Sequence, residues 1–416
     1  MTRDKLFIRW VIMLPVFNIL MDIGMNFLPS LKVPIGLLRI TFLIGLILFF
    51  LTNYKLNKTW LNQLIVFFTL YLIGLSALSS NTSISFIDGA LKTAIPFFMI
   101  PIGILASGMR KNLLVKPMIW VIIILLINYI VSQFFKLGVS IYEKDSFYTG
   151  GATASAPIII ALGLLILFHA FNLRKLPYGK LFTTFIVSSA LFIIVFSLKR
   201  GAILALICAT IVYLLYTGQR VKTIGRFILV GLLMVFILNT NIETFYKRFE
   251  SRTTERNEIQ NEGRYKEIFY IFQEFESSSP LKVFFGTEPF NSDVVMVKYF
   301  GRKRRLHVDY NILLHGTGVF GLLLYLSLYY NLFKININEK NKFRRLKGKK
   351  QTFSFTENFA LVMSILILSL VMGLSGGLQF MSYRIMMFLA TGYYLGNLIH
   401  SNHSGNNQQS ILKKTS

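Results

Sequence analysis

The stretch FILVGLLMVFILNT (residues 227–240) ends one apolar run, and the next long one begins only within HVDYNILLHGTGVFG (residues 307–321). Residues 240–308 between them are polar and rich in basic side chains, whereas apolar runs follow one another along the rest of the chain. A hydrophobic content of 54% and a mean hydropathy of +0.58 are too high for a soluble domain of 416 residues. The sequence therefore predicts an integral membrane protein with one large polar segment.

Apolar runs of the length that a bilayer requires define the predicted fold. A hydrocarbon core takes about 20 mostly apolar residues per helix, and about twelve runs fit that length. The predicted fold class is therefore all-α and polytopic. The predicted transmembrane helices cover residues 7–28, 33–52, 61–79, 84–106, 113–136, 154–172, 181–198, 201–217, 223–239, 309–333, 359–378 and 383–399.

The basic residues of the short loops orient these helices. Lys and Arg accumulate on the cytoplasmic side of membrane proteins, and here nearly all short-loop cations fall on one side, together with both chain ends. Both termini are therefore predicted to be cytoplasmic, and residues 240–308 to face outward. The predicted division is nine helices in residues 1–239, an outer loop in 240–308, three helices in 309–400 with a basic cytoplasmic loop at 334–358, and a tail at 401–416.

The net charge of +26 at first resembles that of a nucleic-acid-binding protein. The charge is spread over separate cytoplasmic loops, however, and the outer segment is close to neutral, so nucleic acid is not an expected partner. The single cysteine, Cys208, lies inside an apolar run and offers neither a disulfide nor a metal cluster. Phosphate-loop, dinucleotide-binding and zinc-protease motifs do not occur, so neither a cofactor nor a metal is expected.

Some charges break the topological rule and are therefore candidates for function. Lys199 and Arg200 stand on the outer side, between two apolar runs, and the small residue Gly201 after them permits close approach of a ligand or a backbone. Arg39 and Arg384 fall in the outer halves of their helices. These placements indicate a polar cavity that opens outward.

Structural interpretations of the buried charges stay open at this point. Arg39 could pair with Asp22 on the preceding helix. Asp88 and Lys92 are four residues apart and could form an ion pair on one helix. Arg384, at a helix end, could extend to the lipid headgroups.

Within the outer segment, EGRYKEIFYIFQEF (residues 262–275) has apolar residues at helical spacing. It predicts an amphipathic helix on the membrane surface or on the mouth of the bundle, with aromatic residues packed against lipid or protein. Arg264 lies near the start of this helix, where backbone N–H groups also attract anions. The arginine and the helix end together could hold a diphosphate.

The second polar group surrounds His307, at the boundary of the next apolar run. An imidazole titrates near neutral pH and can accept a proton from an attacking hydroxyl. Asp309 and Tyr310 follow within one helical turn, and Arg305 ends a basic run that could bind anionic lipid or polysaccharide, or could remain solvated. A structural role for His307 is the alternative, and His315 is expected to be packed inside its helix.

Three of these motifs, in this order, resemble the O-antigen ligase and O-antigen polymerase superfamily of bacterial polysaccharide assembly. FSLKRGAILAL (residues 196–206) is similar to its Ser-x-x-Arg-Gly signature. EGRYKEIFYIFQEF followed by FFGTEPF (residues 284–290) resembles its loop helix and glycine turn. HVDYNILLHGTGVFG resembles its His-x-x-Tyr and Gly-x-x-Gly pattern. Gly316 stands where many members have Glu, and Val308 where they have Asn.

The resemblance implies a membrane fold like that of the C-type glycosyltransferases, with amphipathic helices in the outer loop. It also implies metal-independent, inverting transfer of a glycan from undecaprenyl diphosphate at the outer face of the bacterial cytoplasmic membrane. His307, Arg264 and Arg200 would be catalytic: the arginines would stabilise the diphosphate, and His307 would orient or deprotonate the acceptor hydroxyl. Donor or acceptor binding would involve Lys199, Arg39, Asp309, Tyr310, Arg305 and Arg384.

Three functions remain in competition. A polymerase would move the growing chain onto a lipid-linked repeat unit, and Asp309 close behind His307 favours it. A ligase would move the finished chain to lipid A core or another terminal acceptor. A transporter of lipid-linked glycan is the alternative of another class, although the two halves of the chain look unlike. Membrane lipids, a flippase and chain-length regulators are the partners that the resemblance implies.

Overall fold

The computed structural model is helical throughout the part of the chain that it describes. It describes residues 2–54, 56, 58–78, 84–137, 148, 150, 155–197, 199–218, 224–225, 263–286, 297–299, 301, 306–347, 353–378 and 380–414. Its helices are α1 (Arg3–Phe27), η1 (Pro29–Leu31), α2 (Lys32–Asn53), α3 (Trp60–Leu78), α4 (Ile84–Met109), α5 (Val115–Phe135), α6 (Ala156–Asn172), α7 (Lys180–Phe196), α8 (Arg200–Tyr216), α11 (Gly263–Glu276), α12 (Pro280–Phe285), α14 (Asp309–Lys347), α15 (Phe353–Gly373) and α16 (Met381–Lys414).

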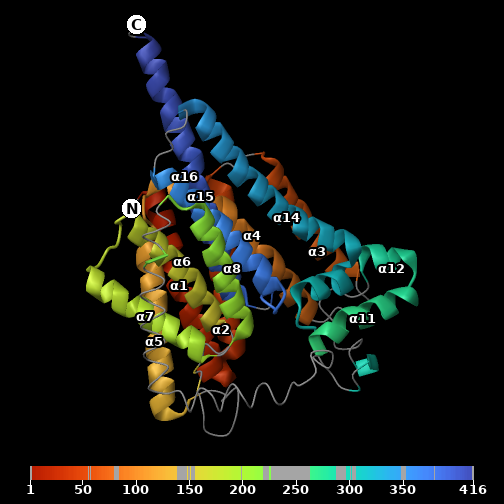
Figure 1. Ribbon diagram of the computed structural model, residues 1–416. Coiled ribbons are helices and arrows are strands. Elements are labelled where there is room, and N and C mark those ends of the chain that lie inside the picture. Colours follow the sequence, from red (N-terminus) through yellow and green to blue (C-terminus); the bar gives the residue numbers. More distant parts are fainter. Residues whose placement is uncertain are drawn as a thin grey trace.

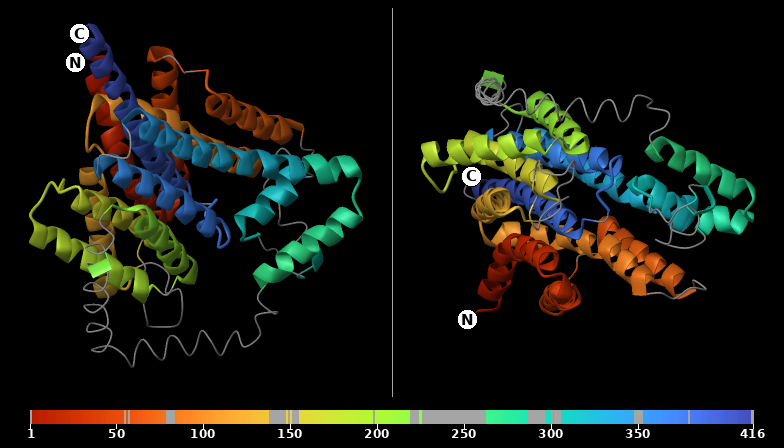
Figure 2. Two further views of the ribbon diagram at one scale, coloured as in Figure 1. Left: turned by 45° about the horizontal axis from the view of Figure 1, so that its top comes forward. Right: turned by 90° about the horizontal axis from the view of Figure 1, so that it is seen from below.

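The membrane-protein prediction is confirmed at this level. Among the described residues, 7 helices are long and apolar enough to cross a membrane, and α6, most of α7 and α8 are shorter apolar helices. Nearly all of the predicted span at 223–239 lies outside the described residues. Both ends of the chain lie at the same end of the bundle (Figures 1 and 2).

Helix boundaries differ from those expected in the C-terminal third. α14 continues to Lys347, through half of the expected loop 334–358, and α16 continues to Lys414, through most of the expected tail. Between residues 334 and 347 the chain has neither Pro nor Gly, and six of its fourteen residues are Lys or Arg, which are good helix formers, so helix formation continues after the apolar run has ended. α15 instead ends early, at Gly373, because glycines follow it.

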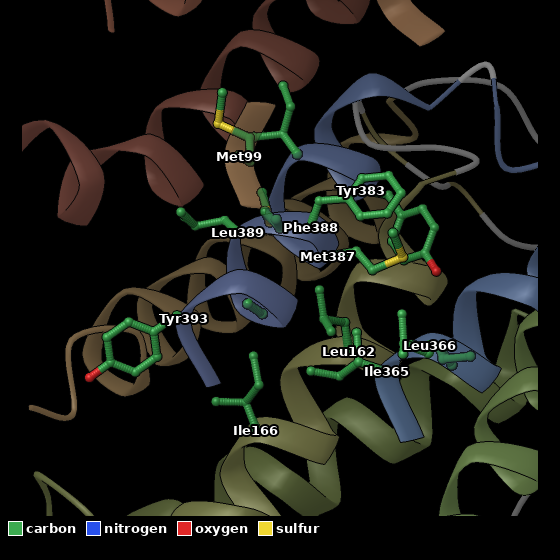
Figure 3. Packing of buried hydrophobic residues seen from close by; sticks show 14 of the residues in the cluster. Met99, Leu162, Ile166, Ile365, Leu366, Tyr383, Met387, Phe388, Leu389 and Tyr393 are labelled. Carbon is green, nitrogen blue, oxygen red and sulfur yellow. The ribbon is translucent and has the colours of Figure 1, made fainter. Parts of the chain in front are cut away.

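The core lies where α4 crosses α16, with α6 and α15 beside them. Apolar side chains of all four helices meet there, among them Met99, Leu162, Ile365 and Phe388 (Figure 3). The two crossing helices are very close: a Cβ added at Gly103 would lie 2.5 Å from the Leu389 carbonyl oxygen. Small residues that allow such approach are a usual device of helix packing in membranes.

α14 is broken near its start, and α12 is inserted at the break. Gly318 has φ 64° and ψ −175°, which separates a short N-terminal piece from the long remainder of the helix. Gly286, at the end of α12, contacts the same backbone, and the Tyr71 hydroxyl of α3 lies 3.0 Å from the Phe285 carbonyl oxygen and 2.8 Å from that of Thr317. α11, α12 and the start of α14 therefore form one unit beside the bundle (Figure 2).

Gly318→Ala is expected to lower the free energy of unfolding by at least about 2 kcal/mol. The new Cβ would lie 2.3 Å from the Phe284 carbonyl oxygen, at a φ that L side chains rarely adopt. Gly74→Ala in α3 is the matched control, because nothing lies within 4 Å of its added Cβ. Thermal unfolding in detergent measures both variants. Equal melting temperatures would mean that α12 does not enter the break as described.

Candidate functional site

A glycine-rich loop between α15 and α16, residues 374–378, organises the candidate site. We call it the glycine loop. Gly376 has φ 90°, and a Cβ there would lie 2.2 Å from the His307 carbonyl oxygen. Only glycine allows the two backbones to meet in this way. The loop thus fixes the chain at the point where His307 leaves the polar segment.

Asp309 fastens the glycine loop from the other side. Its carboxylate is buried and accepts hydrogen bonds from the backbone N–H of Gly377 (2.8 and 3.0 Å) and of Leu378 (2.8 Å). Tyr310 donates its hydroxyl to the Leu370 carbonyl oxygen on α15, at 2.7 Å. Tyr310 therefore holds the start of α14 against α15, and Asp309 holds it against the loop that follows.

The start of α8 contacts the same loop. Gly201 is so close to Ser375 of the loop that a Cβ would lie 2.3 Å from the serine Oγ, and the Lys199 ammonium lies 4.7 Å from the ring centre of Phe380, two residues after the loop. Arg200 stands between them, is exposed, and is the first residue of α8. The glycine loop thus joins Lys199 and Arg200 to His307 and Asp309, which are more than a hundred residues away in the chain.

His307 forms a pair with a residue that the sequence analysis did not select, Glu267 of α11. The imidazole Nδ1 lies 3.2 Å from Glu267 Oε1, and the His307 backbone N–H donates to Oε2 at 3.0 Å. The Glu267 side chain is 0% exposed, whereas that of His307 is 46% exposed. A carboxylate only accepts hydrogen bonds, so a neutral imidazole carries its proton on Nδ1, which leaves Nε2 free to accept another.

The charge of Glu267 is maintained by these contacts. Burial alone would raise its pKa, but the hydrogen bonds from His307 and from the backbone of Val308 outweigh burial and hold the pKa below its ordinary value. Such a carboxylate stabilises the folded state above about pH 4.3, the ordinary glutamate value, and loses this contribution as the pH falls through its lowered pKa. At neutral pH Glu267 therefore stays ionised beside the imidazole.

Glu267→Gln is expected to lower the rate of any reaction in which His307 accepts a proton by about tenfold or more. The amide keeps the shape of the side chain but can present its N–H₂ to Nδ1, which favours the wrong tautomer. Because the two residues act as a unit, adding Glu267→Gln to His307→Ala should not lower the rate any further. Rates for both single variants and the double variant measure this. If the rate of the double variant instead falls by the product of the two single losses, Glu267 has a role that does not depend on His307.

Two candidate residues of the polar segment 240–308 are only partly described or lie outside the description. Arg264 is in the first turn of α11, three residues before Glu267, and its side chain is not described. Arg305 lies outside the described residues. α11 itself confirms the predicted helix, with Ile268, Ile271 and Phe275 packed inward.

Arg39 takes part in an ion pair, as one of the two open interpretations predicted. Its Nη1 donates to Asp22 Oδ1 at 2.6 Å and to Ser382 Oγ at 3.2 Å, so it ties α1 and α2 to α16. Asp22 also accepts a hydrogen bond from Ser155, before α6, at 3.5 Å. The side chain of Asp88 is not described, so its pairing with Lys92 lies outside the description.

The extension of Arg384 to lipid headgroups was a wrong interpretation, because its side chain is buried. Its Nη1 donates to the Lys92 carbonyl oxygen at 3.0 Å, and its guanidinium lies 5.5 Å from the Phe97 ring and 5.7 Å from the Phe388 ring. It also lies close enough to Asp309 for the two charges to attract. Arg384 thus supports the site from inside the bundle.

Asp22→Asn is expected to destabilise the protein by about 3–5 kcal/mol, because it leaves the buried Arg39 charge unpaired. The double variant Asp22→Asn/Arg39→Gln should recover part of this loss. Thermal unfolding and activity are measured on the same preparations. A double variant that is stable but inactive would show that Arg39 acts on the substrate and not only on the fold.

The described residues contain no group of three or more histidine, cysteine or acidic side chains that could hold a metal ion. Comparison of the chain with protein-family models finds no match, and comparison with curated proteins finds none either. The site contains three elements that can take part in chemistry. They are a carboxylate–imidazole pair, two cations at the start of a helix, and a glycine loop that contacts both.

Proposed function

We propose that the protein is a polysaccharide polymerase of the kind that its motifs resemble. It would transfer a glycan from undecaprenyl diphosphate to a lipid-linked repeat unit at the outer face of the bacterial cytoplasmic membrane. The observation that carries the proposal is the half-exposed His307, paired with the buried Glu267 and joined by the glycine loop to Lys199 and Arg200. A proton acceptor and cations brought to the same loop match the two needs of such a transfer.

In the proposed reaction, an acceptor hydroxyl oxygen attacks the anomeric carbon of the donor sugar. The hydroxyl proton passes to His307 Nε2 while the bond from the anomeric carbon to the diphosphate oxygen breaks. The diphosphate leaves with the bonding electrons, and Arg200 and Arg264, assisted by Lys199, stabilise its growing charge. Attack from the face opposite the leaving group inverts the anomeric configuration.

The contacts of Asp309 favour His307 as the proton acceptor. Asp309 is buried, and its carboxylate oxygens already accept backbone hydrogen bonds from the glycine loop. A carboxylate held in this way positions its neighbours, and the imidazole two residues earlier remains half-exposed. We therefore assign Asp309 a positioning role and His307 the proton transfer.

Deletion of the gene tests the polymerase proposal in cells. A polymerase deletion should leave single repeat units on the cell surface and abolish long chains. If full-length chains instead accumulate on the lipid carrier, the protein is a ligase. If the purified protein moves lipid-linked glycan across vesicles and forms no glycosidic bond, it is a transporter.

A further inference from the structure

A cavity of about 570 Å³ lies at the other end of the bundle from the glycine loop. Its walls are the turn after α4, the end of α6, the start of α15 and the part of α16 around His400. Along α16, His400 is sixteen residues beyond Arg384, or about 24 Å at 1.5 Å per residue. The cavity is therefore separate from the site described above, and its volume is in the range of ligand pockets.

The lining of this cavity carries positive charge without an acidic counterpart. Arg110, Lys111 and Lys175 line it, and none of its lining residues is Asp or Glu. Burial and the nearby Lys111 ammonium both lower the pKa of Lys175. The two lysines are thus close enough to repel each other, and a bound anion would remove that cost.

A buried polar atom lies at the inner wall. His169 of α6 is 2% exposed, lines the cavity, and its Nδ1 has no hydrogen-bond partner in the described structure. The Tyr394 ring, 5.0 Å away and perpendicular, holds the imidazole in place. Asn358, also buried, lines the same wall, and its side chain and the Glu357 backbone interact with the imidazole, so only Nδ1 lacks a partner. An unpartnered buried nitrogen is costly, and an oxygen-bearing ligand would satisfy it.

A second cavity, of about 510 Å³, shows by contrast why this one suits an anion. It is lined by Lys340 and Arg344, but the Lys340 ammonium already lies over the rings of Tyr216 (5.1 Å) and Phe359 (4.4 Å). One of its two cationic groups is thus already engaged by aromatic faces. Comparable ring contacts are not found for Arg110, Lys111 or Lys175 among the described residues.

We propose that the cavity between α4, α6, α15 and α16 binds a phosphate group, through Arg110, Lys111 and Lys175 at its mouth and His169 and Asn358 at its inner wall. The phosphate belongs either to the headgroup of an anionic phospholipid or to a small soluble ester. Because Arg110, Lys111 and Lys175 are exposed at the end of the bundle where α4 and α6 end and α15 begins, the ligand enters from this basic end. The proposal does not depend on the reaction at the outer site.

Binding to the full-length protein in phosphatidylcholine nanodiscs tests the proposal in two arms. The lipid arm uses native mass spectrometry to count phosphatidylglycerol molecules retained. The soluble arm uses calorimetry with inorganic phosphate. Lys111→Ala/Lys175→Ala is expected to weaken binding on the order of tenfold or more in the arm that contains the true ligand. Lys175→Arg, which keeps the charge, should retain binding.

Lys342→Ala/Arg345→Ala is the matched control, because it removes the same charge from exposed positions of α14 that line neither cavity. It should bind like the unmodified protein, as should Arg200→Ala, which affects only the outer site. Loss confined to the lipid arm assigns a phospholipid headgroup, and loss confined to the soluble arm assigns a soluble phosphate ester. Equal binding by the cavity variant and the control in both arms would overturn the proposal.

Discussion

His307→Ala is expected to lower the rate of glycan transfer by about 10²–10⁴-fold while the amount of membrane protein stays the same. The variant removes the imidazole that accepts the proton, but the side chain is half-exposed and its backbone contacts remain possible, so the fold should persist. Transfer is measured with purified protein and a lipid-linked repeat unit, and protein amount by quantitative blotting.

Asp309→Asn is the companion variant for this result. It weakens hydrogen bonds that hold the glycine loop and should reduce stability together with activity. If His307→Ala keeps its activity while a stable Asp309→Asn loses it, the proton acceptor is Asp309 and the role assigned to His307 is wrong.

Arg200→Ala is expected to lower transfer by roughly 10²–10³-fold, the usual cost of removing one group that stabilises developing negative charge. Arg200 is exposed at the first position of α8, so its loss should leave the melting temperature almost unchanged. The rate constant at saturating donor should fall more than the apparent affinity, because the charge on the diphosphate grows only as the bond breaks. Steady-state kinetics with varied donor concentration separate the two.

Lys32→Ala provides the control for Arg200→Ala. Lys32 is an exposed cation at the start of α2 and has no place in the proposed site. It should transfer glycan at the unmodified rate. If both variants lose activity equally, the effect comes from the general positive charge of this end of the bundle, and the specific role of Arg200 is refuted.

The sequence predicts the helices well because the length and composition of each apolar run are enough to predict a helix there. The predicted runs that lie within the described residues all coincide with helices, and the amphipathic helix at 262–275 begins within one residue of its predicted start. The predicted boundaries are wrong where a helix extends beyond its apolar run. α14 continues through the polar residues after 333 because none of them stops a helix.

The candidate site was only partly predictable. His307, Asp309 and Arg200 stood out as polar groups at helix ends, and the glycine loop holds them together. Glu267 was missed, because in EGRYKEIFYIFQEF it reads as one more acidic residue on the polar face of a surface helix. Its role depends on a contact with a residue forty positions later in the chain, and no local pattern contains such a contact.

The glycine loop was missed for a similar reason. Residues 374–378 fall at the end of a predicted span, where glycines and serine are unremarkable in themselves. Their importance comes from what approaches them: the His307 carbonyl at Gly376, and the Asp309 carboxylate at the N–H groups of Gly377 and Leu378. Arg39 and Arg384 show the converse, since unusual charge placement in the sequence proved to mark buried contacts.

Incubation of the purified protein with its lipid-linked repeat unit, followed by gel analysis of the products, tests the central claim most directly. We predict a ladder of chains that differ by one repeat unit, which is absent when His307→Ala replaces the unmodified protein. The account would be contradicted if the well-folded, unmodified protein left the repeat units single while it consumed or moved the lipid carrier.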